Sequence, residues 1–412
     1  MTAFELLDAM GGIEERWLCE SYDRARARRI HLTRITAAAA SLLLVSGIGI
    51  GTALTRIYDK GDAEAAPEFE YFGMTETAAA GNTSGRTGET EAAADTTASD
   101  LPTLLFRSGS GGMGFEGIMA RELSEITGTN PWLAEWELTS LPVWYNCSAP
   151  QQYGLPEKPY TGEEMLEIAR EIAGKLGEEI LTHEVGTMQM YTPDGMTEYD
   201  SSVTAETSLY EITVMRGGMV SVLSENDPIG KITDKESALL LYERFSSLLE
   251  FENPEAEVIA SYTYDGEPLY EIYLWDNAGD ETGRILNYAD KILLSSSDTW
   301  YGINFTNAYN RREYLGDYPI ISLEEAVNML LDGYYITTVP KALYGAPESV
   351  DHAELVYRTN DLYVMPYYKF RVPLEEDTDK HFDGEYAWGA YYVPAVSREY
   401  LDESTFWDGR FN

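Results

Sequence analysis

Histidine and cysteine, which supply most zinc ligands in proteins, are scarce in this chain of 412 residues. The four histidines are His31, His183, His352 and His381, which lie far apart and outside any HExxH pattern. The sequence therefore gives no support to a zinc site or a Ser-His-Asp triad, and we predict no catalytic, cofactor-binding or metal-binding residues. A hydrolase with paired carboxylates stays a less favoured alternative, because an acidic chain offers many such pairs.

Positive charge is also scarce, since 29 lysines and arginines face 70 aspartates and glutamates, for a formal net charge of -41. The first 34 residues carry six acidic residues and six arginines, so the negative charge lies in the rest of the chain. A surface this negative repels phosphate backbones and anionic lipid headgroups. We therefore exclude nucleic acid as a partner.

Charge is missing altogether from Ile35 to Leu54, an apolar run of 20 residues. As a helix this run is about 30 Å long, the thickness of the hydrocarbon core of a bilayer. Five arginines and no acidic residue lie between Arg24 and Arg34, whereas acidic residues predominate from Asp59 onward. By the positive-inside rule, the sequence predicts a cytoplasmic tail at 1–34, a transmembrane helix at 35–56 and an extracytoplasmic remainder.

A cleaved signal peptide and a buried core helix are the alternatives for this apolar run. The signal peptide is less favoured because the nearest Ala-x-Ala pattern, Ala63 to Ala65, lies well into the polar region. The membrane topology also places Cys19 and Cys147, the two cysteines, on opposite sides. We therefore expect no intramolecular disulfide.

Large apolar side chains are absent from Thr75 to Asp100, which contains no aromatic residue and no aliphatic residue larger than alanine. Such a segment cannot bury enough surface to offset its ordering entropy. We interpret 57–100 as a disordered spacer. Beyond it, we expect two extracytoplasmic α+β modules, at 101–230 and 231–412.

Three segments start with a hydroxyl residue followed three positions later by glutamate, the signature of a capping box at a helix N-terminus. The pairs are Thr161 with Glu164, Thr233 with Glu236, and Ser322 with Glu325. Apolar residues recur at helical spacing after each pair. We therefore predict three amphipathic helices that cover a sheet.

Alternating apolar residues predict antiparallel strands in the same domain. Turns at Gly217-Gly218 and Asp265-Gly266 predict one hairpin of Tyr210–Val214 with Val220–Val222 and another of Val258–Tyr264 with Leu269–Leu274. Further strands are expected over Leu355–Val364, Tyr367–Val372 and Tyr391–Val396. The fold class that follows is α+β, with amphipathic helices packed on antiparallel sheets in repeated helix-plus-hairpin units, preceded by one transmembrane helix.

Two short motifs resemble ligand loops but lack a required part. Gly109-x-Gly111-x-x-Gly114 has the spacing of a dinucleotide fingerprint, yet no acidic partner for a ribose follows, so we interpret it as a glycine loop before a helix at Glu116 to Ile126. Asp379 to Gly384 resembles the start of a calcium loop, but position twelve is Ala390 instead of glutamate. We interpret this segment as a solvated acidic loop.

Aromatic residues are abundant, and they either fill a core or line a groove for a peptide or glycan. The candidates are Trp132, Trp136, Trp144, Tyr145, Trp300, Tyr301, Tyr367, Tyr368, Trp388, Tyr391 and Tyr392. In the tail, Phe4, Leu7, Met10, Ile13 and Trp17 follow a roughly helical spacing before the arginines. Such a segment either docks on a cytoplasmic protein or leads as a short helix into the membrane.

The segment FELLDAMGGIEERWLCES, the arginines and the apolar run resemble the N-terminal tails of clostridial single-pass proteins grouped with anti-sigma-like regulators. The segments Gly114–Asn146, VMPYYKFRV and YYVPAVS are similar to an uncharacterised family of Gram-positive membrane-anchored proteins. The helix-plus-hairpin pattern resembles the extracytoplasmic PepSY and YycI-type modules. These resemblances imply a non-catalytic regulatory or sensory protein, with an outer domain that binds a ligand or partner and a tail that contacts a cytoplasmic protein. The alternative is an envelope interaction protein that acts only outside the cell.

Overall fold

The computed structural model describes residues 101–106, 109–110, 118–149, 156–192, 195–263, 266–337, 339, 352–373 and 386–402. The chain divides into two units, and every described residue belongs to the same one. The predicted tail, transmembrane helix and spacer lie outside these residues, as do Gly111, Gly114 and the acidic motif at 379–384. Within the described ranges, no helix has both the length and the apolar character needed to span a bilayer.

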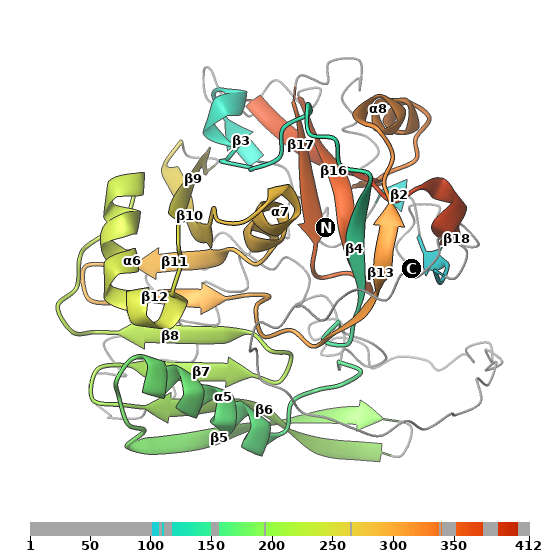
Figure 1. Ribbon diagram of the computed structural model, residues 1–412. Coiled ribbons are helices and arrows are strands. Elements are labelled where there is room, and N and C mark those ends of the chain that lie inside the picture. Colours follow the sequence, from blue (N-terminus) through green and yellow to red (C-terminus); the bar gives the residue numbers. More distant parts are fainter. Residues whose placement is uncertain are drawn as a thin grey trace, which may run out of the picture. The chain divides into compact units, whose positions relative to one another are not determined.

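The first sheet contains eight strands of the described chain, all joined by antiparallel pairings (Figure 1). In spatial order they are β5 (Thr182–Thr192), β6 (Gly195–Glu206), β7 (Glu211–Met215), β8 (Val220–Ser224), β12 (Tyr301–Phe305), β11 (Ile292–Ser296), β10 (Pro268–Asp276) and β9 (Pro254–Tyr262). Both predicted hairpins are confirmed, as β7–β8 and β9–β10. Because β8 pairs with β12, residues on both sides of position 230 belong to this one sheet.

Two helices, α5 (Gly162–Lys175) and α6 (Lys235–Leu249), cover one face of the first sheet. Their apolar stripes, including Ile172 and Phe245, share one core with the alternating residues of the strands, such as Val203 and Ile272. The capping box that starts α5 is confirmed, because the Thr161 side chain accepts from the Glu164 N–H while the Glu164 side chain accepts from the Thr161 N–H. The amphipathic pattern therefore fixes both the position of α5 and the face that it buries.

The second sheet is built from chain segments that precede and follow the first sheet in the sequence. Its described strands run in the order β13 (Arg312–Pro319), β4 (Ser140–Asn146), β16 (Tyr363–Pro373), β17 (Tyr386–Pro394), β14 (Ile336–Thr337) and β2 (Gly109–Ser110). In addition, β15 (Ala353–Arg358) pairs with β16, and β3 (Ile118–Ala120) pairs with β17. Helix α8 (Leu323–Leu331) contacts β17, and α7 (Glu281–Ala289) contacts β15. The short strands β1 (Leu104–Leu105) and β18 (Leu401–Asp402) pair in parallel.

The α+β class is confirmed, but several local predictions need correction. The helix expected at Glu116 to Ile126 is wrong: residues 118–120 form β3, which pairs with β17, and only a 3₁₀ turn covers Leu123–Glu125. The second helix begins one residue later than expected, since its N-cap is Asp234, whose carboxylate accepts from the Ser237 N–H at 2.8 Å. Residues 118–120 are a strand because pairing with the distant β17 overrides the local helical periodicity. At α6, the Asp234 carboxylate caps the helix in place of the Thr233 hydroxyl because it is the better acceptor.

Candidate functional site

Helix α7 contacts β10 of the first sheet and β15 of the second. Its N-cap is Asp280, which accepts from the Gly283 N–H at 2.7 Å. One side of α7 buries Ile285 in the core of the second sheet, and Tyr288 meets the ring of Trp275 on β10 at 5.4 Å between centroids. The helix therefore joins the two sheets, and side chains from both meet around it.

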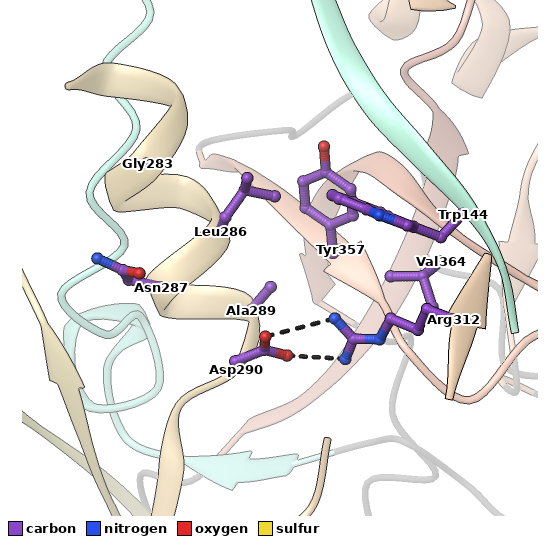
Figure 2. A pocket seen from close by; sticks show the side chains of 9 residues that line it. All are labelled: Trp144, Gly283, Leu286, Asn287, Ala289, Asp290, Arg312, Tyr357 and Val364. Carbon is purple, nitrogen blue, oxygen red and sulfur yellow. Dashed lines mark hydrogen bonds and ion pairs between the residues drawn. The ribbon is translucent and has the colours of Figure 1, made fainter. Parts of the chain in front are cut away.

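A pocket of about 250 Å³ opens between α7 and the second sheet (Figure 2). Residues from α7 and its C-cap, from β4, β13, β15 and β16 line it, namely Trp144, Gly283, Leu286, Asn287, Ala289, Asp290, Arg312, Tyr357 and Val364. The volume is slightly below that of the pockets that enclose drug-sized molecules, about 300–1,000 Å³. It suits one small molecule or one side chain of a peptide.

Aromatic rings form a rigid wall of this pocket. The Trp144 ring lies 5.9 Å from the Tyr357 ring and 6.2 Å from the Tyr314 ring, measured between centroids. The Tyr357 hydroxyl donates to the Pro142 carbonyl at 2.9 Å, which fixes its ring. Burial raises the pKa of Tyr357 well above its usual value, so this phenol stays neutral. Because the Tyr357 hydroxyl is already hydrogen-bonded, the wall offers a ligand the apolar faces of these rings.

The polar side of the pocket is a half-buried ion pair between Arg312 and Asp290. Arg312 donates to both carboxylate oxygens of Asp290, at 2.8 and 3.3 Å, and to the Asn307 carbonyl at 3.1 Å. Figure 2 shows this pair facing the apolar residues Ala289 and Val364. The Arg312 Nε–H is buried and has no hydrogen-bond partner among the described residues. The pocket therefore combines a flat apolar wall with one fixed charged pair.

A second group of polar side chains is buried behind α7. The Glu257 carboxylate, on a residue only 1% exposed, accepts from the Tyr288 hydroxyl at 2.7 Å and forms an ion pair with Lys291. The Lys291 ammonium lies 4.2 Å from the centroid of the Tyr273 ring and 4.3 Å from that of Tyr288. Burial, reinforced by neighbouring carboxylates, raises the pKa of both phenols well above the usual value. The Glu257 carboxylate, the Tyr288 hydroxyl and the Lys291 ammonium therefore satisfy one another.

A related ion pair lies on the second sheet, where Lys369 of β16 is directly opposite Glu354 of β15. The two charged groups are 3.3 Å apart, and His352 Nε2 lies 3.6 Å from the other carboxylate oxygen. Burial alone would raise the pKa of the Glu354 carboxyl, but Lys369, His352 and Arg371 hold it well below its usual value. Burial, followed by the charge of Arg371, lowers the pKa of the Lys369 amino group.

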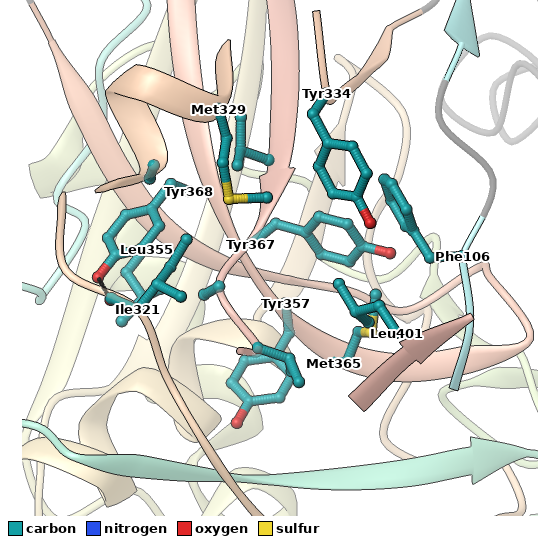
Figure 3. Packing of buried hydrophobic residues seen from close by; sticks show 14 of the residues in the cluster. Phe106, Ile321, Met329, Tyr334, Leu355, Tyr357, Met365, Tyr367, Tyr368 and Leu401 are labelled. Atoms are coloured by element: carbon teal, nitrogen blue, oxygen red, sulfur yellow. Dashed lines mark hydrogen bonds between the residues drawn. The ribbon is translucent and has the colours of Figure 1, made fainter. Parts of the chain in front are cut away.

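The aromatic residues that could fill a core or line a groove lie in different places. Of these residues, Trp144 lines the pocket, whereas Tyr367 and Tyr368 are buried in the core of the second sheet (Figure 3). Tyr301 belongs to the first sheet, where its ring packs on Phe245 at 5.9 Å. No local sequence signal points to Arg312, Asp290 or Tyr357, because these residues are of ordinary types and lie far apart along the chain.

The remaining sequence candidates are dispersed. His183 is exposed on β5, and His352 adjoins Glu354, so the two do not meet. In the part of the chain that the structure describes, no group of three histidine, cysteine or carboxylate residues is placed to hold a metal ion. Cys147 is a buried free thiol, and Cys19 lies outside the described residues.

No protein-family model and no curated protein matches this chain. Among solved structures, the chain is similar to an uncharacterized protein from Eubacterium rectale with a crystal structure at 1.45 Å resolution. The two are 9% identical, the alignment covers 63% of this chain and 84% of the other, and the TM-score is 0.30. A likeness this distant assigns neither a family nor a function.

Proposed function

We propose that this chain is a single-pass protein of the cell membrane that serves a regulatory or sensory role without catalysis. In this proposal residues 1–34 lie in the cytoplasm, Ile35 to Leu54 cross the membrane, and the α+β domain binds a ligand or a partner protein outside. The 20-residue uncharged run and the arginines before it support the topology. The tail, in turn, contacts a cytoplasmic protein.

The pocket between α7 and the second sheet carries the binding part of this proposal. An aromatic wall beside a fixed ion pair favours a small compound, or one side chain of a peptide, with an apolar flat part and a polar end. A ligand there touches Leu286, Ala289 and Asp290, and the same helix carries Tyr288 into the buried network on the first sheet. Occupancy thus acts on the element that joins the two sheets.

Binding is tested by thermal unfolding of the full-length protein with the twenty free amino acids and a set of dipeptides. A compound that binds this pocket should raise the unfolding temperature saturably. The variant Ala289→Phe, which fills the pocket, should abolish the rise, and Trp300→Ala, a tryptophan outside the pocket, should preserve it. A rise that survives Ala289→Phe places the ligand elsewhere.

The topology is tested by labelling intact cells with a membrane-impermeant thiol reagent. A Thr96→Cys variant should react from outside, whereas Cys19 should react only after the membrane is opened. Cys147 is 1% exposed and should stay unreactive in the folded protein, so it does not confuse the result. Labelling of Cys19 in intact cells would overturn the proposed orientation.

Signalling through the tail is tested by crosslinking in membranes, with the full-length protein compared to one that lacks residues 1–20. A cytoplasmic partner that is lost with the tail supports transmembrane regulation. Capture of the same envelope proteins by both forms, with no cytoplasmic partner, indicates an interaction protein that acts only outside. In that case the outer domain on a foreign membrane anchor should restore function.

A further inference from the structure

One face of the second sheet collects nitrogen donors around Arg371. Lys369 and Arg371 are two residues apart on β16, so their side chains share a face. Across the sheet, Lys369 lies opposite Glu354, and Arg371 lies opposite Ala390 of β17, which is two residues from Trp388 and shares its face. Glu354 and Trp388 therefore belong to the face that carries Arg371.

The buried charges around this face do not balance. Glu257 has Lys291 as its ion-pair partner, and Glu354 has Lys369. Arg371 is only 4% exposed, its Nε–H has no hydrogen-bond partner among the described residues, and its charge acts on Glu354, the carboxylate that already pairs with Lys369. Lys369 and Arg371 thus share the single buried carboxylate of Glu354, and a buried charge that is only partly compensated is unfavourable. The positive charge of Arg371 is therefore in excess, in a chain whose net charge is -41.

The chemistry of the unused groups specifies what is missing. The Nε–H of Arg371 and the indole N–H of Trp388 are both buried and unpaired among the described residues. Guanidinium and indole nitrogens donate hydrogen bonds and never accept them. The absent partner must therefore be an acceptor, and the excess positive charge favours a negatively charged one.

This cluster borders solvent on one side. The side chain of Lys369 is 17% exposed, and that of His352 is 35% exposed, while Glu354 between them is only 3% exposed. The Nε2 atom of His352 is buried, 3.6 Å from the Glu354 carboxylate. Solvent therefore reaches the edge of the cluster at Lys369 and His352, next to the buried donor groups of Arg371 and Trp388.

We propose that Arg371, Trp388, Lys369 and His352 form a binding site for a small oxyanion, a carboxylate or a phosphate group, held chiefly by Arg371. The guanidinium supplies the charge and a directional pair of donors, and the indole N–H fixes the orientation. This site is formed by residues other than those that line the pocket beside Trp144, and it does not depend on the function proposed for that pocket.

The test is the unfolding temperature of the full-length protein in increasing sodium phosphate or sodium acetate, at fixed pH and with sodium chloride to keep ionic strength constant. We expect a saturable rise with one of the two anions, and which anion acts identifies the source of the oxyanion. Arg371→Gln should abolish this rise. The matched control Arg170→Gln, which removes an exposed arginine of α5, should keep it.

A second variant tests the proposal even if Arg371→Gln does not fold. Trp388→Phe keeps an aromatic ring but removes the indole donor, and it should weaken anion affinity about tenfold, the effect of losing one hydrogen bond to a charged group. The proposal is overturned if neither anion gives a saturable rise in the wild-type protein. It is also overturned if Arg371→Gln folds and retains the wild-type response, or if Trp388→Phe binds the anion as tightly as the wild type does.

Discussion

The ammonium group of Lys291 forms an ion pair with the carboxylate of Glu257, at a point where α7 meets the first sheet. The carboxylate also accepts from Tyr288 and lies against the backbone of Gly128. A buried pair of this kind contributes little net stability compared with apolar residues, but the loss of one partner is costly. This relationship makes the junction of the two sheets sensitive to single substitutions.

Glu257→Gln should lower the free energy of unfolding by about 3 kcal/mol, because it leaves the Lys291 charge without its counter-ion. Urea unfolding followed by tryptophan fluorescence measures the change. The double variant Glu257→Gln with Lys291→Met removes both charges and should recover part of the loss. A single variant as stable as the wild type would show that the ion pair is dispensable.

Gly128→Ala should be destabilising by about 1–3 kcal/mol, the usual cost of overpacking. An added Cβ would lie 1.4 Å from the Glu257 carboxylate oxygen, so that the ion pair must move. Gly174→Ala in α5 is the matched control, since a Cβ there meets nothing within 4 Å and alanine favours the helix. The two variants should therefore shift the urea midpoint in opposite directions, and equal shifts would contradict the packing at Gly128.

Asp234→Ala should cost about 1 kcal/mol, because Asp234 accepts from the Ser237 N–H and caps α6. Thr233→Ala is the control at the neighbouring position, which the sequence pattern wrongly assigns as the cap, and it should be close to neutral. Chemical unfolding of both variants measures the difference. If Thr233→Ala lost more stability than Asp234→Ala, Thr233 would be the N-cap of α6.

Alkaline pH should destabilise the domain through Tyr318 and Tyr368. Burial raises the pKa of each phenol from 10 to about 12. Below pH 10 these phenols are neutral in both the folded and the unfolded protein. Between pH 10 and 12 the unfolded chain ionises first, and stability falls by about 1.4 kcal/mol per pH unit for each phenol.

The measurement is urea unfolding from pH 8 to 11.5 for the wild type, Tyr318→Phe and Tyr368→Phe. Each substitution also removes a hydrogen bond, to the Pro102 or the Ile321 carbonyl, and the difference at pH 8 gives that cost alone. The loss of stability above pH 10 should be shallower in each variant than in the wild type. Parallel curves would show that neither phenol titrates in this way.

Local signals in the sequence predict the parts of the fold that local interactions determine. The α5 capping box and the hairpin turn at Gly217-Gly218 depend on residues within a few positions of one another. In that turn Gly218 has φ +98° and its Cα lies so close to Tyr309 that a Cβ would be 2.6 Å from the carbonyl oxygen. Such requirements are visible in the residue types themselves.

The second sheet and the pocket are different, because distant pairings create them. Arg312 on β13 lies opposite Asn146 on β4, and the Tyr357 hydroxyl reaches the Pro142 carbonyl. Contacts between residues so far apart in the sequence leave no periodic pattern in a short segment of the chain. Helix α7 is only nine residues long and contains a glycine, so its pattern was too weak to predict, although it lines the pocket.

The order of strands along the chain also sets the order in which the two sheets can be completed during synthesis. The first sheet uses only residues between Thr182 and Phe305, a continuous stretch, and it has all its strands once that stretch has left the ribosome. Strand β4 must wait, with its edges unpaired, until β13 and β16 emerge roughly 170 and 220 residues later. The nascent chain thus keeps β4 without its strand partners while the first sheet can already form.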